Sequence, residues 1–171
     1  MRQALSRRLP IVLAIATAFG LGALLPSAFG ETKVEPTVVR NALAQTDQVQ
    51  GAPNRTLVLS RVVVGPGAKL ALHHHLGTQV AQVTSGVLTY TVREGSVIVR
   101  SGESDQQPVT TVRAIKAGQT GKIRAGSWIV EQPSTIHQAA NNGTVPVVIY
   151  LATLLKKGAP PATPITGPQG G

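Results

Sequence analysis

Histidines at positions 73 and 75 are the residues of this chain whose type and spacing could do chemistry. They lie in the strand-like run Lys69–His75. Because side chains alternate across a strand, His73 and His75 point to one face, with β-carbons roughly 6–7 Å apart. Two imidazoles at that spacing can chelate one metal ion, and a third from another strand would complete a facial nitrogen-donor set. Outside this run the chain has one histidine, His137.

A polar surface patch is the alternative explanation for this cluster of histidines. Strand parity alone supports the pair His73 and His75, and it does not bring His137 near them. His74 has the opposite parity, so we expect its ring to be exposed or hydrogen-bonded rather than a ligand.

The 171 residues suffice for one domain with an apolar core and are too few for two ordinary domains. The chain has no cysteine, which excludes a disulfide framework, a thiolate-metal site and a cysteine nucleophile. A metal site would therefore use imidazole and oxygen donors.

Residues 1–30 have the three parts of a secretory signal. Three arginines precede the apolar run Leu9–Leu25, and small residues at positions 28 and 30 form a cleavage site. We expect cleavage after Gly30 and export to the periplasm or the medium. A twin-arginine signal and an uncleaved anchor are the alternatives. Pro10 argues against the first, and the short, glycine-containing run argues against the second.

Loss of this signal would remove three of the 16 Lys and Arg residues and none of the seven Asp and Glu residues, leaving a net charge of +6. The cations are scattered singly along the mature chain, and three aromatic residues remain: Tyr90, Trp128 and Tyr150. A nucleic-acid surface combines clustered cations with stacking aromatics, so we expect no nucleic-acid partner. The positive charge favours an anionic small ligand or acts only on solubility.

Short β-branched segments separated by glycine-containing turns predict an all-β domain, a sandwich or a barrel. No segment after residue 55 has a sustained apolar period of 3.6 residues. Residues 31–54 are predicted to be a lead-in arm with one short strand, and residues 156–171, rich in Pro and Gly, a disordered tail. The predicted strands are 57–64, 69–75, 79–84, 87–93, 96–100, 109–115, 120–125, 128–131, 136–140 and 145–155.

Two stretches resemble the two sequence motifs of the cupins. The first, Gly67–Gly86, matches the spacing of that motif throughout, with Gln79 where the family commonly has glutamate. The second, Gly126–Asn141, keeps the separations from glycine to histidine and from histidine to asparagine. It departs from the usual pattern at Pro133 and Ser134. With the strands between them, the two motifs cover most of the mature chain.

The resemblance implies a single cupin domain over residues 55–155, a jelly-roll β-barrel. In that family the two histidines and the acidic residue of the first motif and the histidine of the second bind one divalent metal inside the barrel. Carried over to this chain, the ligands are His73, His75 and His137, with Gln79 as the fourth. The metal would be Fe, Mn, Ni, Cu or Zn. The family also implies a homodimer formed through sheet edges.

Gln79 changes the expected chemistry of such a site. An amide oxygen can coordinate a hard cation but carries no charge, so the metal would keep its full dipositive charge and bind less tightly. That charge would favour an anionic ligand such as a carboxylate, an enolate or a β-diketonate. Alternatively, Gln79 stays off the metal and hydrogen-bonds a bound water or substrate.

Four further residues near the motifs have ordinary structural explanations. Asn141 is expected to cap a turn with its side chain. Trp128 and Tyr90 are expected to be core or pocket-wall residues. Glu131, the carboxylate nearest the second motif, is a weak candidate base, and we expect it to be a solvated charge.

The sequence thus predicts an exported metal-binding cupin that acts as a metal-dependent dioxygenase or related oxidoreductase on a small anionic or enolisable substrate. The fold alone does not fix that function. A non-catalytic envelope protein that binds a small anion or a metal is the alternative. A cupin of assembly or storage fits less well, because a single barrel retains the metal histidines. Membrane contact is expected only through the signal peptide.

Overall fold

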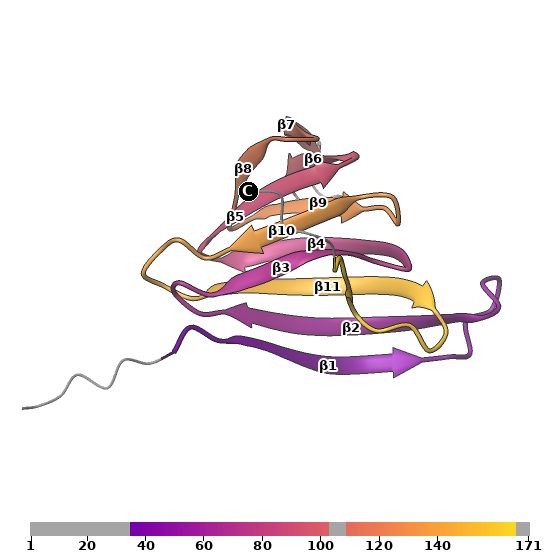
Figure 1. Ribbon diagram of the computed structural model, residues 1–171. Helices are drawn as coiled ribbons and strands as arrows, with labels where there is room; N and C mark the ends of the chain where they lie inside the picture. The colour runs from indigo at the N-terminus through magenta and orange to yellow at the C-terminus, as the bar shows by residue number, and fades with distance from the viewer. Residues whose placement is uncertain (1–34, 103–108, 167–171) are drawn as a thin grey trace, which may run out of the picture. The chain divides into compact units, whose positions relative to one another are not determined.

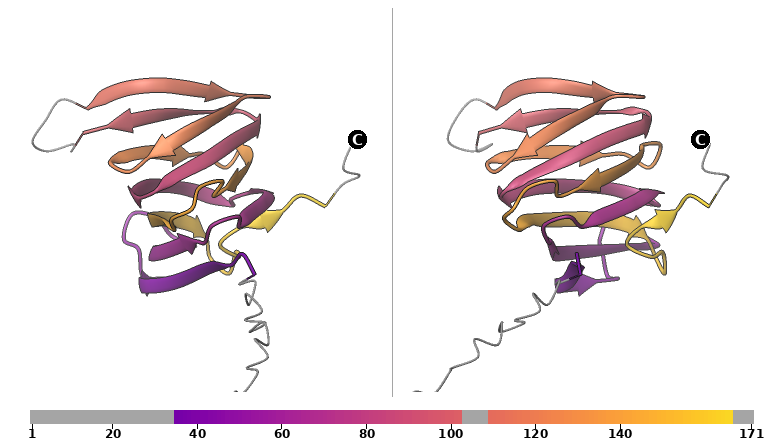
Figure 2. Two further views of the ribbon diagram at one scale, coloured as in Figure 1. Left: turned by 90° about the vertical axis from the view of Figure 1, so that its left-hand side faces the viewer. Right: turned by 60° about the vertical axis from the view of Figure 1, so that its left-hand side comes forward.

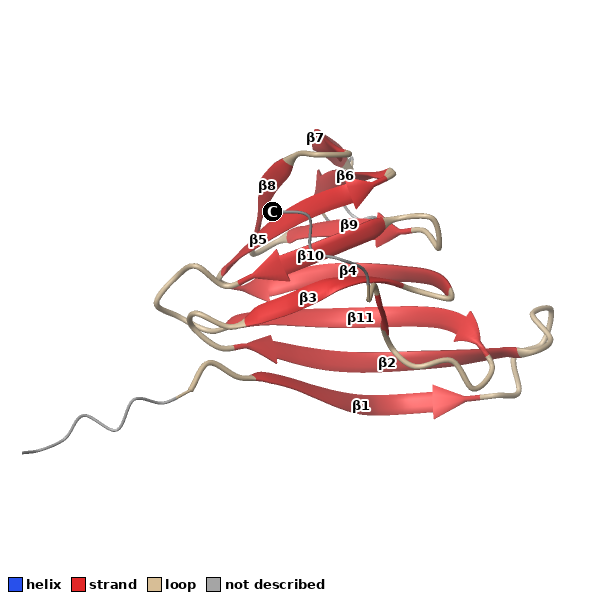
Figure 3. Ribbon diagram, in the orientation of Figure 1, coloured by secondary structure: helices blue, strands red, loops and turns tan. Residues whose placement is uncertain are grey.

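The computed structural model describes residues 35–102 and 109–166. The predicted signal at 1–30, the first residues of the arm and the end of the tail therefore lie outside the described residues. Figure 3 shows that the described part of the chain consists of strands joined by loops. None of these residues forms a helix able to cross a membrane.

Twelve β-strands make up the described residues. Each strand predicted between residues 57 and 155 has its counterpart, so the prediction of an all-β fold is confirmed. The strands are β1 (Val38–Thr46), β2 (Arg55–Val64), β3 (Lys69–His74), β4 (Gly77–Ser85), β5 (Val87–Glu94), β6 (Ser96–Ser101), β7 (Thr110–Lys116), β8 (Thr120–Arg124), β9 (Ser127–Glu131), β10 (Ile136–Ala140), β11 (Val147–Lys156) and β12 (Thr163–Pro164).

The strands form two antiparallel sheets, in the arrangement of a jelly roll. The larger has the order β1-β2-β11-β4-β9-β6-β7, and the smaller has the order β12-β3-β10-β5-β8. Figures 1 and 2 show the strands of both sheets lying one above another, from β1 at one end of the domain to β7 and β8 at the other.

Alternation along each strand places one set of side chains inside and the other outside. In β11 the residues 147, 149, 151, 153 and 155 are buried, and the residues between them are more exposed. The buried apolar side chains form one continuous cluster, in which Val62, Val83, Ile129 and Ile149 represent the larger sheet. This apolar interior surrounds the polar groups described below.

The C-terminal segment is ordered, which corrects the prediction of a disordered tail for the residues described after Lys156. Strand β12 extends the smaller sheet beside β3, where Thr163 pairs with His74 and Pro164 with His73. The amide of Ile165 also donates a hydrogen bond to the carbonyl of Leu72, 3.0 Å away. The segment docks through backbone hydrogen bonds on an open strand edge, where proline is tolerated, and therefore needs little apolar surface.

Gly77 opens β4, two residues before the predicted start of that strand at residue 79, and pairs with Leu155 of β11. A β-carbon at this position would press on the Leu154 carbonyl oxygen and lie 2.7 Å from the Leu155 α-carbon. The close approach fixes β4 against β11 two residues before Gln79, which pairs with Thr153.

Replacement Gly77→Ala should therefore lower the free energy of unfolding by about 3 kcal/mol or more, because backbone atoms must move. Gly126→Ala is the control: its φ of +82° is unfavourable to alanine, but no atom lies within 4 Å of the added carbon. It should cost about 1–2 kcal/mol. Equilibrium urea unfolding measures both variants, and equal losses would contradict the steric argument.

Candidate metal centre

Three histidines converge inside the barrel from the smaller sheet. His73 of β3 and His137 of β10 are direct cross-strand partners, and His75 follows two residues after His73 on the same side. Their exposed fractions are 6%, 0% and 2% for His73, His75 and His137. One ring nitrogen from each lies within 4.8 Å of the others, so the three could hold one metal ion. The structure thus brings His137 to the pair that strand parity had placed on one face.

Both neighbours of β10 bulge beside His137: β3 has one extra residue between Leu70 and His73, and β5 has one between Val92 and Glu94. Bulges of this kind bend a strand and redirect its side chains, and they recur beside functional sites.

Each histidine is oriented by a backbone carbonyl that accepts from Nδ1. The acceptors are Ala71 at 2.6 Å for His73, Pro161 at 2.8 Å for His75 and Thr135 at 3.4 Å for His137. A carbonyl can only accept, so each Nδ1 carries the proton and each Nε2 keeps its lone pair. The lone pair of His75 accepts from the Gln79 amide nitrogen at 2.9 Å. Metal-bound histidines are held by this kind of partner.

Burial keeps these imidazoles neutral. Desolvation lowers the pKa of His73, of His75 and of His137, and it outweighs the opposing effect of the nearby Glu131 charge. Neutral imidazole is the form that coordinates a metal.

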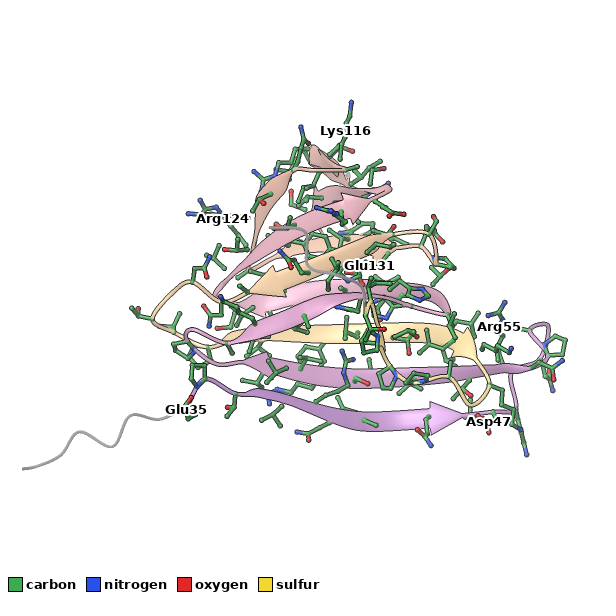
Figure 4. The ribbon with its side chains drawn as sticks, in the orientation of Figure 1. Glu35, Asp47, Arg55, Lys116, Arg124 and Glu131 are labelled. Carbon is green, nitrogen blue, oxygen red and sulfur yellow. The ribbon has the colours of Figure 1, made fainter. Side chains whose placement is uncertain are left out.

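Glu131 lies inside this site, which corrects the expectation of a solvated charge. It is the cross-strand partner of Gln79 and is 3% exposed. Figure 4 places it among the stacked strands, whereas the other labelled charged residues lie at the periphery. The parity of β9 could have revealed this position, because Glu131 alternates with the buried Ile129.

Two hydrogen-bond donors hold the Glu131 carboxylate. The Tyr90 hydroxyl donates to Oε1 at 2.7 Å, and the Gln79 amide nitrogen donates to Oε2. Burial raises the pKa of Glu131, but the charges of His137 and His75 and these two hydrogen bonds outweigh it, so the pKa lies below its usual value. Glu131 is therefore a buried carboxylate.

Tyr90 is a wall of the site, as its aromatic ring led us to expect, and it also supplies a polar contact. Its ring stacks on His137 with centroids 4.9 Å apart and an interplanar angle of 18°. Burial, followed by the Glu131 charge, raises the pKa of the Tyr90 phenol, so the hydroxyl keeps its proton and donates.

Gln79 faces the site and leaves one atom unsatisfied. Its Nε2 lies 2.9 Å from Nε2 of His75, and its Oε1 is buried without a hydrogen-bond partner among the described residues. An orphaned buried acceptor costs about 1–3 kcal/mol. Together with three unprotonated Nε2 atoms and a carboxylate, it makes a donor set that fits a divalent cation.

Other residues singled out from the sequence lie outside this centre. Asn141 caps a turn: its Nδ2 donates to the carbonyls of Val64 and Val145, and its Oδ1 accepts from the amide of Gly143. Trp128, expected in the core or a pocket wall, is instead half-buried on the outer face of β9, and Arg100 lies 5.3 Å from its ring centroid.

Two cavities adjoin the centre. The inner one measures about 40 Å³ and is lined by His73, His137, Gln79 and Glu131 together with apolar residues of the core. That volume holds about three water-sized groups. The outer one measures about 500 Å³ and is lined by residues of β1, β2 and β11 and by the segment that includes Pro161.

Arg40 of β1 lines both cavities, and the sequence analysis did not identify it. Within residues 35–102 and 109–166 its guanidinium makes no hydrogen bond and no ion pair. In the outer cavity, the carboxylate of Asp47 is already 3.4 Å from the Lys157 ammonium and accepts a hydrogen bond from Thr56. Arg40 thus places a cation at the border of the two cavities, where the charge of Glu131 opposes the lowering of its pKa by burial.

Comparisons with known proteins support the fold. No profile of a protein family matches the sequence, and no curated protein is similar to it in sequence. Solved structures do match. A cupin 2 domain-containing protein from Halorhodospira halophila superposes with a TM-score of 0.50 at 15% identity, over 81% of this chain and 77% of that chain. The polyketide cyclase RemF from Streptomyces resistomycificus superposes with a TM-score of 0.50 at 17% identity, over 77% and 73%. The chain therefore has the cupin fold, as the two motifs led us to expect.

Proposed function

We propose that this protein is an exported cupin enzyme that depends on one divalent metal and acts as a dioxygenase or related oxidoreductase on a small anionic or enolisable substrate. The observation that carries the proposal is the convergence of three neutral imidazoles, each with Nδ1 bonded to a carbonyl and Nε2 unprotonated. The fold is shared with a polyketide cyclase, which supports an enzyme by analogy.

In this proposal His73, His75 and His137 hold the metal, which when bound polarises a coordinated oxygen atom. Glu131 supplies a buried negative charge beside the histidines. Tyr90 keeps that carboxylate in place through its hydroxyl. The apolar lining of the inner cavity excludes bulk water and strengthens these electrostatic contacts.

The two cavities suggest how substrate is bound. The inner cavity has room for a few water-sized groups, so the body of a larger substrate lies in the outer cavity. Thr153 lines the outer cavity and is the cross-strand partner of Gln79, which lines the inner one, so the two spaces are neighbours. Arg40 at their border binds the anionic group.

A non-catalytic binding protein is the second candidate. Its support is that Tyr90 and Gln79 already engage Glu131, the carboxylate that lines the inner cavity among the described residues. A fully engaged carboxylate suits a binding site as well as a reaction.

Export and self-association are also part of the proposal. A mature chain that begins at Glu31 in the periplasm or the medium would support export, and an uncleaved chain retained in the cell would count against it.

A row of apolar side chains crosses the outer face of the larger sheet, where Leu59 pairs with Ala152 and Ala152 with Val80. Leu59 and Val80 are 42% and 41% exposed, which supports a homodimer through this face rather than through the sheet edges that the resemblance implies. Light scattering measures the mass of the protein in solution and distinguishes a monomer from a homodimer.

The metal proposal predicts that untagged protein binds one equivalent of Mn(II), Fe(II), Ni(II), Cu(II) or Zn(II). His73→Ala should weaken binding by at least about 100-fold, because a direct ligand is lost. His74→Ala is the matched control and should stay within about threefold, since that ring faces away from the site. Titration calorimetry after chelator treatment measures both. Equal affinity of the two variants, or no binding by the native protein, would refute the metal site.

The role of Arg40 predicts a selective loss with anionic ligands. A panel of β-diketones and phenolic acids is assayed for oxygen uptake and product with each metal. Arg40→Gln should raise KM for anionic substrates about 10- to 100-fold, the value of a lost charged hydrogen bond. Arg61→Gln, which removes a cation that lines neither cavity, should not. A panel without turnover but with tight, Arg40-dependent binding would favour the binding protein, and no effect of Arg40→Gln would exclude its role.

The buried histidines also predict how stability depends on pH. Their pKa values are lowered in the folded chain, so below pH 6.5 the unfolded chain binds more protons and stability falls. Each histidine contributes a slope of at most about 1.4 kcal/mol per pH unit. Above pH 6.5 this contribution is constant, and Glu131 adds its own loss only below pH 4.5, because its folded pKa is also lowered. Urea unfolding of metal-free protein should show a shallower slope in His73→Ala; an unchanged slope would contradict the assignment.

A further inference from the structure

Glu131 lies between two histidines, with each carboxylate oxygen close to a ring nitrogen. Its Oε1 is 3.2 Å from Nε2 of His137, and its Oε2 is 3.5 Å from Nε2 of His75. Both rings have Nδ1 next to a carbonyl oxygen, so Nε2 presents a lone pair toward the carboxylate. The Gln79 amide donates to both Oε2 of Glu131 and Nε2 of His75 and so bridges that contact. Among the described residues no donor bridges Oε1 and Nε2 of His137, and two acceptors at such a distance repel each other unless a positive group lies between them.

The distances match those between neighbouring ligands of one metal ion. With bonds of about 2.0–2.2 Å and angles between those of an octahedron and a tetrahedron, adjacent donor atoms lie roughly 2.8–3.6 Å apart. We propose that Glu131 supplies the anionic fourth ligand beside His73, His75 and His137, and that Gln79 is a positioning residue for its carboxylate. The inference rests on the proposed metal-dependent function.

The pairing of Gln79 with Glu131 explains why an amide occupies position 79. The two residues are cross-strand partners on β4 and β9, and both side chains point inward. Gln79 donates to Oε2 of Glu131, which a glutamate could not do in its ionised form. Two carboxylates at these positions would repel each other in an apolar interior. The charge missing from position 79 is thus present on the neighbouring strand.

The other contacts of Glu131 fit the same role. Tyr90 donates to Oε1, so each carboxylate oxygen has a donor that fixes its direction and leaves a second lone pair for the cation. Ligating carboxylates are commonly held by such hydrogen bonds. With Glu131 as a ligand, the centre carries a net charge of about +1, rather than the full dipositive charge expected from three histidines and Gln79.

The test exchanges the two residues. Mature protein and the variants Glu131→Gln, Gln79→Glu and Gln79→Glu/Glu131→Gln are titrated with Co(II) and Zn(II) by calorimetry, and the visible spectrum of the Co(II) form is recorded. Glu131→Gln should bind at least about 10- to 100-fold more weakly, with an altered spectrum. The double variant, which moves the carboxylate to the partner strand, should recover affinity to within about tenfold of the native protein. Gln79→Glu alone should not tighten binding to the same extent, since two carboxylates then compete.

Several outcomes would overturn the inference. Glu131→Gln with native affinity and spectrum would show that Glu131 is a buried neighbour of the histidines and not a metal ligand, as would a double variant that binds no more tightly than Glu131→Gln. Circular dichroism checks that the variants fold; if Glu131→Gln does not, a structure of the Zn(II)-loaded native protein decides, because a carboxylate oxygen farther than about 3 Å from the ion rejects the assignment. A native protein that binds no metal would refute the proposed function itself, which is a separate result.

Discussion

The burial of polar groups inside an apolar barrel is the constraint on which the rest of this structure depends. Three imidazoles, a carboxylate, an amide and a phenol are withdrawn from water, and each such group destabilises the fold unless it finds a partner. The partners come from different strands and from the C-terminal segment. Strand order, the register of β4 against β9 and the docking of residues 157–166 are therefore all tied to the same cluster.

Periodicity and turn residues predicted the strands well, because burial of alternate side chains in a jelly roll leaves a regular pattern in the sequence. The same parity placed His73 and His75 on one face. Only the resemblance to the cupin motifs predicted that His137 lies near them, because the pairing of β10 with β3 joins residues far apart in the sequence. Asn141 was also correctly expected to cap a turn.

Three features of the structure differ from the predictions or were not predicted, and each has a physical reason. Glu131 was judged as an isolated charge, although strand parity with Ile129 places it inside. The sequence around Arg40 does not indicate a binding site. Its place beside both cavities depends on the pairing of β1 with β2, which is not evident from neighbouring residues. The tail was judged by its apolar content, and it is held instead by backbone hydrogen bonds to β3. Composition does not report on a free strand edge.

The carbonyl of Pro161 has two neighbours at once: it accepts from Nδ1 of His75, and its residue lines the outer cavity. A molecule that fills that cavity and moves this segment would change how strongly His75 donates to whatever its other nitrogen binds. Occupancy of the two cavities would then share a coupling free energy, and thermodynamic reciprocity requires each ligand to change the affinity for the other by the same factor. In this sense, the segment around Pro161 would connect the outer cavity with the metal centre.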